Sequence, residues 1–448
     1  MDKRTFLKTS SVLTGGALLS RFAGCTAEEK KEHMKNWAGN LEYSTGNVHY
    51  PTTVAEVQEA VKKCKKVRPL GSKHSFNKIA DSTENQVSLE KMNKVVSLNK
   101  EANTVSIEGG MRYGELAPYL HQNGYALHNL ASLPHITVAG AVATGTHGSG
   151  VKSGNLSTGI SAIEFVNAAG DIVNLSKQKD GELFNGAVVA FGALGVVTKV
   201  TLDLQPTFNM KQLVYRNLPM SELKNNFDAI EASGYSVSLF TDWKNKNVNE
   251  VWIKSKAEAN DAAAAPELFG AKLATQNMHP IETESAENCT EQMGVAGPWY
   301  ERMPHFKMGF KPSAGKELQS EFFVPIEHAY DAMMAMEKLN EKITPHLFIS
   351  EIRTIQADDL WMSPCYKQTC VALHTTWKQE DEVMNLIPLI EEQLAPFNYR
   401  PHWAKLFTIV PKILQSRYEK LKDFKELVHQ YDPNGKFRND FLDTNLFS

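Results

Sequence analysis

The sequence predicts an α+β protein of more than one domain, and three observations support this prediction. The chain has 448 residues, which is enough for two or three domains that each bury a core. Hydrophobic residues make up 42% and charged residues 22%, as in ordinary soluble globular proteins. Short strand and helix patterns alternate up to residue 205, and widely spaced strands with helices between them follow.

The charge and the cysteines exclude several classes of function. The net charge is −3 and there is no long basic run, so we expect no nucleic-acid partner. The five cysteines form no CxxC pair, and the spacing of Cys365 and Cys370 fits neither a zinc ribbon nor a redox pair. Four of the cysteines are therefore interpreted as inert thiols. Cys25 differs, because it follows a targeting segment.

Residues 1–25 have the pattern of a signal peptide. A basic start precedes an apolar run at 12–19 that is too short to span a membrane. Residues 3–8 resemble a twin-arginine signal, and residues 22–25 resemble a lipoprotein cleavage box. A plain cleaved signal, or an uncleaved tail, is the alternative. The sequence thus predicts an exported bacterial protein, either periplasmic or anchored to the membrane surface by a lipid on Cys25.

The first predicted domain, residues 36–205, mixes short strands with amphipathic helices. Thr53 and Glu56 have the spacing of a capping box, and apolar residues after them recur with helical periodicity. Two alternating runs on either side of residues 169–171 predict a hairpin. The expected helices are 54–64 and 113–123, and the expected strands are 67–70, 87–89, 104–108, 161–167, 172–175 and 196–204.

The second predicted domain, residues 206–400, carries the widely spaced strands. We expect an antiparallel sheet covered by helices, although residues 257–317 show no clear pattern. The expected strands are 236–241, 250–254, 318–324, 347–354 and 369–377, and the expected helices are 326–339 and 380–394. The last predicted segment, 401–448, contains a helix near 417–428 and a turn at 432–435.

Two stretches with few bulky side chains are candidate ligand-binding loops. Residues 69–76 form a turn rich in Gly and Ser that offers backbone N–H groups to an anion, with His74 at its centre. Residues 131–150 carry almost nothing bulky after Val142, so this backbone must lie against something flat or phosphorylated. No GxGxxG opens a helix and no GxxxxGK[ST] occurs, which leaves Rossmann and P-loop sites unsupported. Taken alone, residues 69–76 are also compatible with an ordinary surface turn.

Charged residues on the predicted strands form a second candidate site. Alternation along a strand puts Glu351 and Arg353 on one face, about 7 Å apart at a rise of about 3.3 Å per residue, and His374 and Thr376 share a face for the same reason. An acid beside two cations, Arg353 and Lys405, suits a polyhydroxylated substrate. The carboxylate accepts hydrogen bonds from hydroxyls, and the cations stabilise an alkoxide. The alternative is a cross-strand salt bridge without a catalytic role.

Together these motifs resemble the vanillyl-alcohol oxidase superfamily of flavin enzymes, and within it the alditol (xylitol) oxidase branch. The resemblance implies a two-domain flavoprotein. Its FAD-binding α/β domain is completed by the C-terminal tail, and its substrate domain has an antiparallel sheet covered by helices. The similarity extends from about residue 36 to the end and is most specific at 71–76, 131–150, 351–353, 374–377 and 402–407.

The resemblance also implies roles for individual residues. His74 matches the histidine that is joined covalently to FAD. The substrate site matches Ser132, Glu351, Arg353, Thr376 and Lys405, of which Glu351, Arg353 and Lys405 are the catalytic group. The cofactor site matches Pro69, Leu70, Gly71, Ser72, Lys73, His74, Ser75, Ser132, Thr137, Gly140, Ala141, Val142, Ala143 and Val197. No metal is implied, because the spacing of His135, His147 and His402 fits no ligand pattern, and these histidines are expected to pack against the cofactor.

The implied activity is oxidation of the terminal hydroxyl of a sugar alcohol, such as xylitol or sorbitol, to the aldose. The expected partners are the polyol and O2, which is reduced to H2O2. One alternative is an aldonolactone oxidase or dehydrogenase, which shares the Glu-x-Arg pattern. The other is a non-catalytic exported polyol-binding lipoprotein, against which the His74 loop argues, because a pure binder needs no covalent redox ring.

Overall fold

The computed structural model describes residues 34–258, 263–309 and 316–448. The predicted signal peptide and Cys25 lie outside these residues. Within them, no helix combines the length and the apolar character that crossing a membrane requires.

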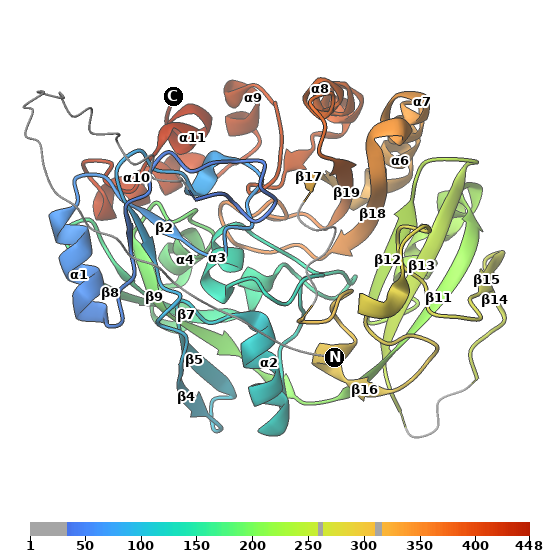
Figure 1. The fold of residues 1–448 in the computed structure, drawn as a ribbon, viewed down its shortest axis with the longest axis horizontal. Helices are drawn as coiled ribbons and strands as arrows, with labels where there is room; N and C mark the ends of the chain where they lie inside the picture. The colour runs from blue at the N-terminus through green and yellow to red at the C-terminus, as the bar shows by residue number, and fades with distance from the viewer. Residues whose placement is uncertain (1–33, 259–262, 310–315) are drawn as a thin grey trace, which may run out of the picture. The chain divides into compact units, whose positions relative to one another are not determined.

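The N-terminal part of the fold contains two separate sheets, one parallel and one antiparallel (Figure 1). The parallel sheet has the order β1-β3-β2, with bounds Val48–His49, Gln86–Ser88 and Arg68–Leu70. The antiparallel sheet has the order β4-β5-β9-β7-β8, with bounds Val95–Asn99, Thr104–Glu108, Val196–Asp203, Ile160–Val166 and Ile172–Ser176. A short pair, β6 (Tyr125–Ala126) and β10 (Gln205–Pro206), lies outside both sheets.

Two helices of this part begin where the sequence predicts them, at residues 54 and 113. Helix α1 (Val54–Lys63) is capped by Thr53, whose hydroxyl accepts from the Glu56 N–H at 3.2 Å. The Glu56 carboxylate accepts from the N–H of Thr52 at 2.7 Å, one residue before the Thr53 N–H that a capping box would use. The second predicted helix is α2 (Tyr113–Gln122), whereas α3 (Val138–Ala143) and α4 (Lys177–Val188) were not predicted.

A large antiparallel sheet forms the second part of the fold. Its strands follow the order β14-β15-β11-β13-β12-β18-β19-β17-β20, and β16 pairs with β11 at its side. The bounds in that order are Glu267–Leu268, Ala271–Leu273, Asn209–Pro219, Asn247–Lys256, Ser236–Thr241, Leu347–Ile355, Cys370–Lys378, Glu317–Pro325, Arg400–Pro401 and, for β16, Gly297–Pro298. The sequence did not predict β11, the longest of these strands, nor β4 in the first part.

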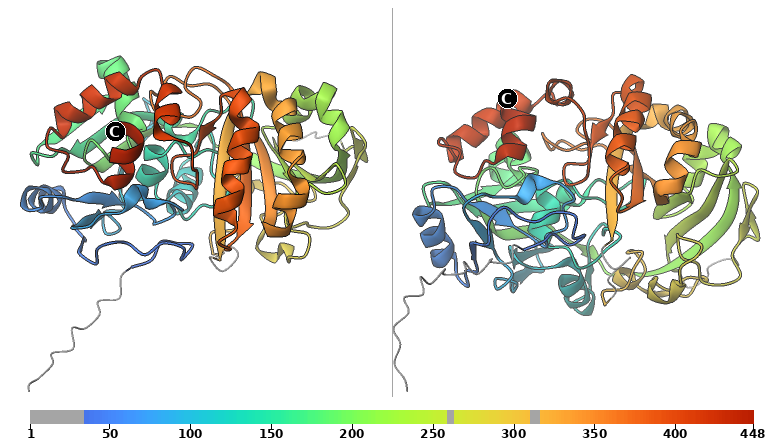
Figure 2. Two further views of the ribbon diagram at one scale, coloured as in Figure 1. Left: turned by 90° about the horizontal axis from the view of Figure 1, so that it is seen from above. Right: turned by 45° about the horizontal axis from the view of Figure 1, so that its top comes forward.

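Helices cover one face of the large sheet, as predicted (Figure 2). Their bounds are α5 (Leu223–Glu231), α6 (Ala329–Glu337), α7 (Asn340–Ile343) and α8 (Val383–Leu394). Alternation along β18 sends Ile352 into the core that these helices share, with residues such as Met333. Glu351 and Arg353 therefore point to the opposite face, which is the face that carries the candidate site.

The C-terminal tail returns to the N-terminal sheets, as the resemblance predicts. Its helices are α9 (Pro411–Ser416), α10 (Leu421–Tyr431) and α11 (Asp440–Leu442). The N–H of Val67 donates to Lys436 O at 3.0 Å, and the buried Arg68 guanidinium donates to Phe437 O at 2.5 Å. These bonds attach the tail to the strand that leads into the His74 loop. The domain boundaries near residues 205 and 400 stay predictions.

Candidate active site

One cavity of about 1110 Å³ brings the two predicted sites together. The His74 loop and α3 line one side of it. The face of β17, β18 and β19 that is turned away from the covering helices lines the other side. Every residue predicted for the substrate site lines this cavity, and so does every predicted cofactor position except Val142. Val142 packs in the hydrophobic core, because a helix such as α3 can present only part of its circumference to the cavity.

The segment 36–40 holds the His74 loop in place. The indole of Trp37 stacks on the His74 ring with 4.2 Å between the ring centroids. The Trp37 N–H donates to Lys73 O at 2.8 Å, and the Asn36 side-chain amide donates to Ser75 O at 2.9 Å. The loop is therefore fixed on both sides of His74 before any ligand binds.

His74 itself is neutral and its Nε2 atom has no hydrogen-bond partner among the described residues. Burial, reinforced by the nearby His135 ring, lowers the pKa of His74 to about 3. A neutral imidazole keeps a nitrogen lone pair, which is the form that bonds to an electrophilic carbon. His74 thus fits the covalent attachment that the resemblance implies.

Glycines bring the backbone of the His74 loop against α3. A Cβ on Gly71 or on Gly140 would lie only 2.8 or 2.7 Å from Thr137 Oγ1. That hydroxyl is buried without a partner among the described residues. A close backbone cradle with unpaired polar atoms, in a cavity of this volume, fits a nucleotide cofactor such as FAD.

The opposite wall is a row of three side chains set by strand register. Glu321 on β17 pairs with His374 on β19, and His374 pairs with Glu351 on β18. Residues directly opposite one another in a sheet point to the same face. Two carboxylates therefore flank one imidazole at the cavity wall.

Two cations neutralise Glu321. Arg353 Nη2 lies 2.6 Å from Glu321 Oε1, and Lys405 Nζ lies 2.8 Å from Oε2. Burial by itself would raise the pKa of Glu321, but Lys405, His147 and Arg353 outweigh it and hold this pKa well below its usual value. Arg353 also approaches Glu351, with 3.6 Å between Nε and Oε1. Glu351 and Arg353 are thus part of a buried charge network at the cavity wall, and their catalytic role stays a prediction.

His374 is the wall residue with unused hydrogen-bonding capacity. Both of its ring nitrogens are buried without a partner among the described residues. Burial, reinforced by Lys405, lowers its pKa well below the usual value, so the ring is neutral. The lone pair of this neutral imidazole can accept a hydrogen bond from a hydroxyl, and the two carboxylates partly offset the effect of burial and Lys405 on its pKa.

Lys405 reaches the cavity on a loop that is bonded to both sides of the site. The side-chain amide of Asn77, just after the His74 loop, donates to Trp403 O at 2.8 Å and to Lys405 O at 2.7 Å. The N–H of His402 donates to Glu321 O at 2.9 Å. The loop therefore fixes Lys405 relative to both the cofactor side and the substrate side.

The three predicted packing histidines differ in their surroundings. His135 lies beside His74, with 5.0 Å between ring centroids. His147 and His402 instead approach Glu321, and the ligand atoms of these three residues lie within 4.8 Å of one another. Arg353 and Lys405 already bind both oxygens of that carboxylate. A metal ion there would meet two fixed positive charges, so this cluster is better described as a charge network.

Sequence reasoning missed several residues of the site. Glu321, His305 and Trp37 were not predicted, and His374 was noted only for sharing a face with Thr376. One signal was available: large polar residues recur at every second position, Glu317, Gln319 and Glu321, at the start of the predicted strand 318–324. All three line the cavity. Ser132, another predicted substrate residue, contacts the charge network, with 3.5 Å between its Oγ and Arg353 Nη1. The substrate roles of the predicted residues stay predictions.

Comparisons with known families and proteins agree with this geometry. Residues 46–176 match the model described as FAD binding domain, and residues 310–445 match the model described as D-arabinono-1,4-lactone oxidase. The alditol oxidase of a Streptomyces species is 43% identical over 413 residues, which cover 91% of this chain and 98% of that protein. The L-gulonolactone oxidase of Mus musculus is 26% identical over 442 residues, which cover 92% of this chain and 98% of that protein.

Solved structures support the fold alone. The cholesterol oxidase of B. sterolicum aligns with a TM-score of 0.75 at 13% identity, over 93% of this chain and 96% of that one. A carbohydrate oxidase of Microdochium nivale aligns with a TM-score of 0.71 at 14% identity, over 92% of this chain and 94% of that one. Because the Streptomyces relative matches over nearly its whole length and the cavity fits FAD, the chain belongs to the alditol oxidase branch of the vanillyl-alcohol oxidase superfamily, a group of FAD-dependent oxidoreductases.

Proposed function

We propose that this enzyme oxidises the terminal hydroxyl of open-chain sugar alcohols, such as xylitol and sorbitol, to the aldose. Two electrons and two protons leave the terminal carbinol, and O2 takes up both to become H2O2. The observation that carries this proposal is the row Glu321–His374–Glu351, with Arg353 and Lys405, on the cavity wall. The 43% identity to an alditol oxidase supports it.

The residues of the wall divide the work between binding and proton transfer. FAD, when bound, supplies the acceptor for the hydride and returns the electrons to O2. His374 accepts the proton of the reacting hydroxyl, since its ring is neutral and neither nitrogen has a partner among the residues that the structure describes. Arg353 and Lys405 stabilise the negative charge that develops on that oxygen. Glu351 and Thr376, which also line the cavity, accept hydrogen bonds from the other hydroxyls of the chain.

Product analysis tests this proposal. With xylitol in air, the purified enzyme is expected to release one aldose and one H2O2 for each polyol consumed. The lactone model that matches residues 310–445 favours a second candidate, oxidation of an aldonolactone. Turnover of L-gulono-1,4-lactone without turnover of any polyol would establish that candidate instead.

The FAD is further proposed to be covalently attached through His74. The neutral ring and its Nε2 atom, which has no partner within the described part of the chain, support this. Acid precipitation of the holoenzyme should leave yellow flavin in the pellet, whereas the His74→Ala variant should release its flavin to the supernatant. Flavin that stays with the denatured His74→Ala chain would refute the assignment.

Export is proposed from the signal pattern of residues 1–25, with Cys25 as a lipid anchor. Fractionation of expressing bacteria should recover the enzyme outside the cytoplasm, and Cys25→Ser should release it from the membrane fraction. A full-length enzyme found only in the cytoplasm would contradict export. Enzyme that is exported but equally soluble with and without Cys25 would contradict the anchor.

A further inference from the structure

A buried lysine lies behind the cavity wall, on a strand that the sequence analysis did not connect with the site. Lys254 of β13 is 1% exposed. Its Nζ atom has three neighbours within hydrogen-bond distance: Met303 O at 2.5 Å, Pro304 O at 3.1 Å and His305 Nδ1 at 3.0 Å. An ammonium group has three hydrogens and no lone pair, so each neighbour receives one hydrogen bond.

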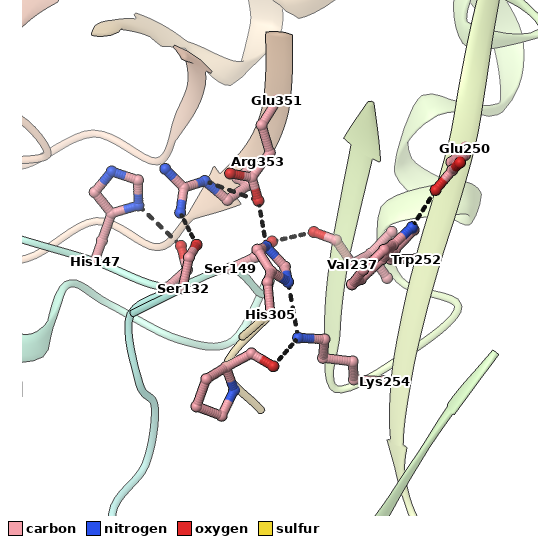
Figure 3. Close-up of polar contacts among 12 residues, drawn as sticks. Ser132, His147, Ser149, Val237, Glu250, Trp252, Lys254, His305, Glu351 and Arg353 are labelled. Carbon is pink, nitrogen blue, oxygen red and sulfur yellow. Dashed lines mark hydrogen bonds and ion pairs between the residues drawn. The ribbon is translucent and has the colours of Figure 1, made fainter. Parts of the chain in front are cut away.

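The bond from Lys254 determines where His305 carries its proton. A neutral imidazole has one donor and one acceptor nitrogen. Burial, reinforced by Lys254, lowers the pKa of His305 to about 4, so the ring is neutral. Because Nδ1 accepts from Lys254, the hydrogen lies on Nε2, which is 2.7 Å from Glu351 Oε1. Figure 3 shows the three residues in line, with His305 between the ammonium and the carboxylate.

Glu351 depends on this bond for both its charge and its direction. Burial alone would raise the pKa of Glu351, but Arg353 and the bond from His305 outweigh it and hold the pKa well below its usual value. If Lys254 lost its proton, the amine would keep two hydrogens for the three acceptors Met303 O, Pro304 O and His305 Nδ1. At least one of the bonds that fix His305 and its loop would then be lost, and the ring would no longer be held with Nε2–H directed at Glu351 by a charged donor.

The same loop also holds a second residue of the site. The N–H groups of His305 and Phe306 both donate to Ser132 O, at 3.1 and 3.3 Å. Since Lys254 binds the carbonyl groups of the two residues that precede His305, it fixes this loop as well as the ring. Loss of the ammonium would thus reach the cavity at Glu351 and at Ser132.

We propose that Lys254 is a positioning residue of the active site, which acts through His305 to hold Glu351 ionised and directed at the polyol. This inference rests on the proposed function for its effect on turnover. It does not make Lys254 a catalytic residue, since Lys254 touches neither substrate nor cofactor positions.

A dependence on pH follows from the surroundings of Lys254. Burial lowers the pKa of Lys254 to about 7, although the negative charge of Glu351 raises this pKa in part. Cys289 also raises this pKa, and Arg353 lowers it. The residues opposite Lys254 on the neighbouring strands, Gln212 and Ser236, carry no charge. The ammonium form that positions Glu351 is therefore lost as the pH rises through that value, and flavin reduction by the polyol should fall on the alkaline side.

The test is a double-mutant cycle on the holoenzyme, read by anaerobic flavin reduction at saturating xylitol. Lys254→Met should lower the limiting rate about tenfold and remove the alkaline fall. In a His305→Gln background the same change should cost less than about twofold, because the glutamine amide donates to Glu351 without help from Lys254. Lys256→Met, on the same strand but with its cation over the Phe208 ring, is the control and should leave the rate unchanged. Equal losses in the two backgrounds would overturn the proposal.

Two further measurements keep the proposal decidable. Should Lys254→Met not fold, the variants His305→Gln and His305→Phe replace it. The limiting rate of His305→Gln should then exceed that of His305→Phe about tenfold, and equal rates would contradict the proposal. Nitrogen NMR of histidine-labelled protein, with the His305 signal assigned by its loss in His305→Gln, should show a hydrogen on Nε2. A hydrogen on Nδ1 in the wild type would directly refute the proposed hydrogen bonds from Lys254 to His305 and from His305 to Glu351. If no polyol reduces the wild-type flavin, the proposed function fails while the NMR result still decides the role of Lys254.

Discussion

Arg353 is the residue on which the charge of the cavity wall depends most. It binds Glu321 at 2.6 Å and approaches Glu351 at 3.6 Å, so its loss leaves two buried carboxylates with fewer positive partners. Arg353→Met should slow flavin reduction by xylitol about a hundredfold at saturation, as expected when a preorganised charged donor is removed. Arg216→Met on β11, which breaks an exposed ion pair with Glu282, is the matched control. A wild-type rate in Arg353→Met, measured by stopped-flow without oxygen, would remove Arg353 from the mechanism.

His374 should show the signature of a proton acceptor. His374→Ala is expected to lower the rate of flavin reduction at least about a hundredfold, and the remaining rate should rise with pH as hydroxide replaces the imidazole. In the wild type the His374 ring is already neutral near pH 6, because its pKa lies well below the usual value. A His374→Ala profile parallel to that of the wild type, with only a raised KM, would assign His374 to binding instead.

Single residues of the site were predictable where a motif or alternation within one strand fixed them. Glu351 and Arg353 are two positions apart on β18, so the sequence alone puts them on one face. Glu321 joins them only because β17 and β18 both pair with β19, where His374 lies 53 residues after Glu321 and 23 after Glu351, and no local pattern specifies that register. His305 lies in a stretch without periodicity and reaches Glu351 only through tertiary folding.

The loop 402–405 shows how one element connects the two sides of the cavity. Asn77 donates two hydrogen bonds to its carbonyl groups. Asn77→Ala should loosen Lys405 and lower flavin reduction about tenfold, with a loss of about 1 kcal/mol of stability for each buried bond. Asn123→Ala, an exposed asparagine bonded only to its own helix at Tyr119 O, is the control. Unchanged kinetics together with an unchanged melting temperature in Asn77→Ala would show that the loop 402–405 keeps its conformation without the Asn77 hydrogen bonds.

Elements with a strong local pattern were predicted within a few residues, as α1 and β12 show. The strand β11 was missed because Asn209–Pro219 mixes polar and apolar residues without strict alternation, and its 11 residues are stabilised by pairing with β13 and β15. Residues 257–317 have no local pattern for the same reason. Their short strands and loops, including the loop that carries His305, are fixed by contacts with the large sheet.

At the scale of the whole molecule, the buried titratable groups predict sensitivity to acid. His305 has a folded pKa of about 4, and those of His374 and His402 lie well below the usual value of about 6.5. Between these values the unfolded chain binds protons that the folded chain does not, so stability falls as the pH drops below about 6.5. Glu321 and Glu351, whose folded pKa values are depressed, extend the loss below about pH 4.5.

Urea unfolding of the holoenzyme, followed by tryptophan fluorescence, should therefore show a midpoint that decreases steadily from about pH 7.5 to about pH 5. The exposed His328→Asn variant should follow the same curve. A midpoint that is constant or rises over this range would mean that these histidines are protonated in the folded protein.

The proposed function places an open-chain polyol against a wall built from β17, β18 and β19, beside an FAD held at the His74 loop. The most direct test mixes the oxygen-free holoenzyme with xylitol, sorbitol or L-gulono-1,4-lactone in a stopped-flow spectrometer and follows the flavin absorbance. We expect both polyols to bleach the flavin within the enzyme's turnover time, and the lactone to leave it oxidised. Bleaching by the lactone with no response to either polyol would contradict the proposed function.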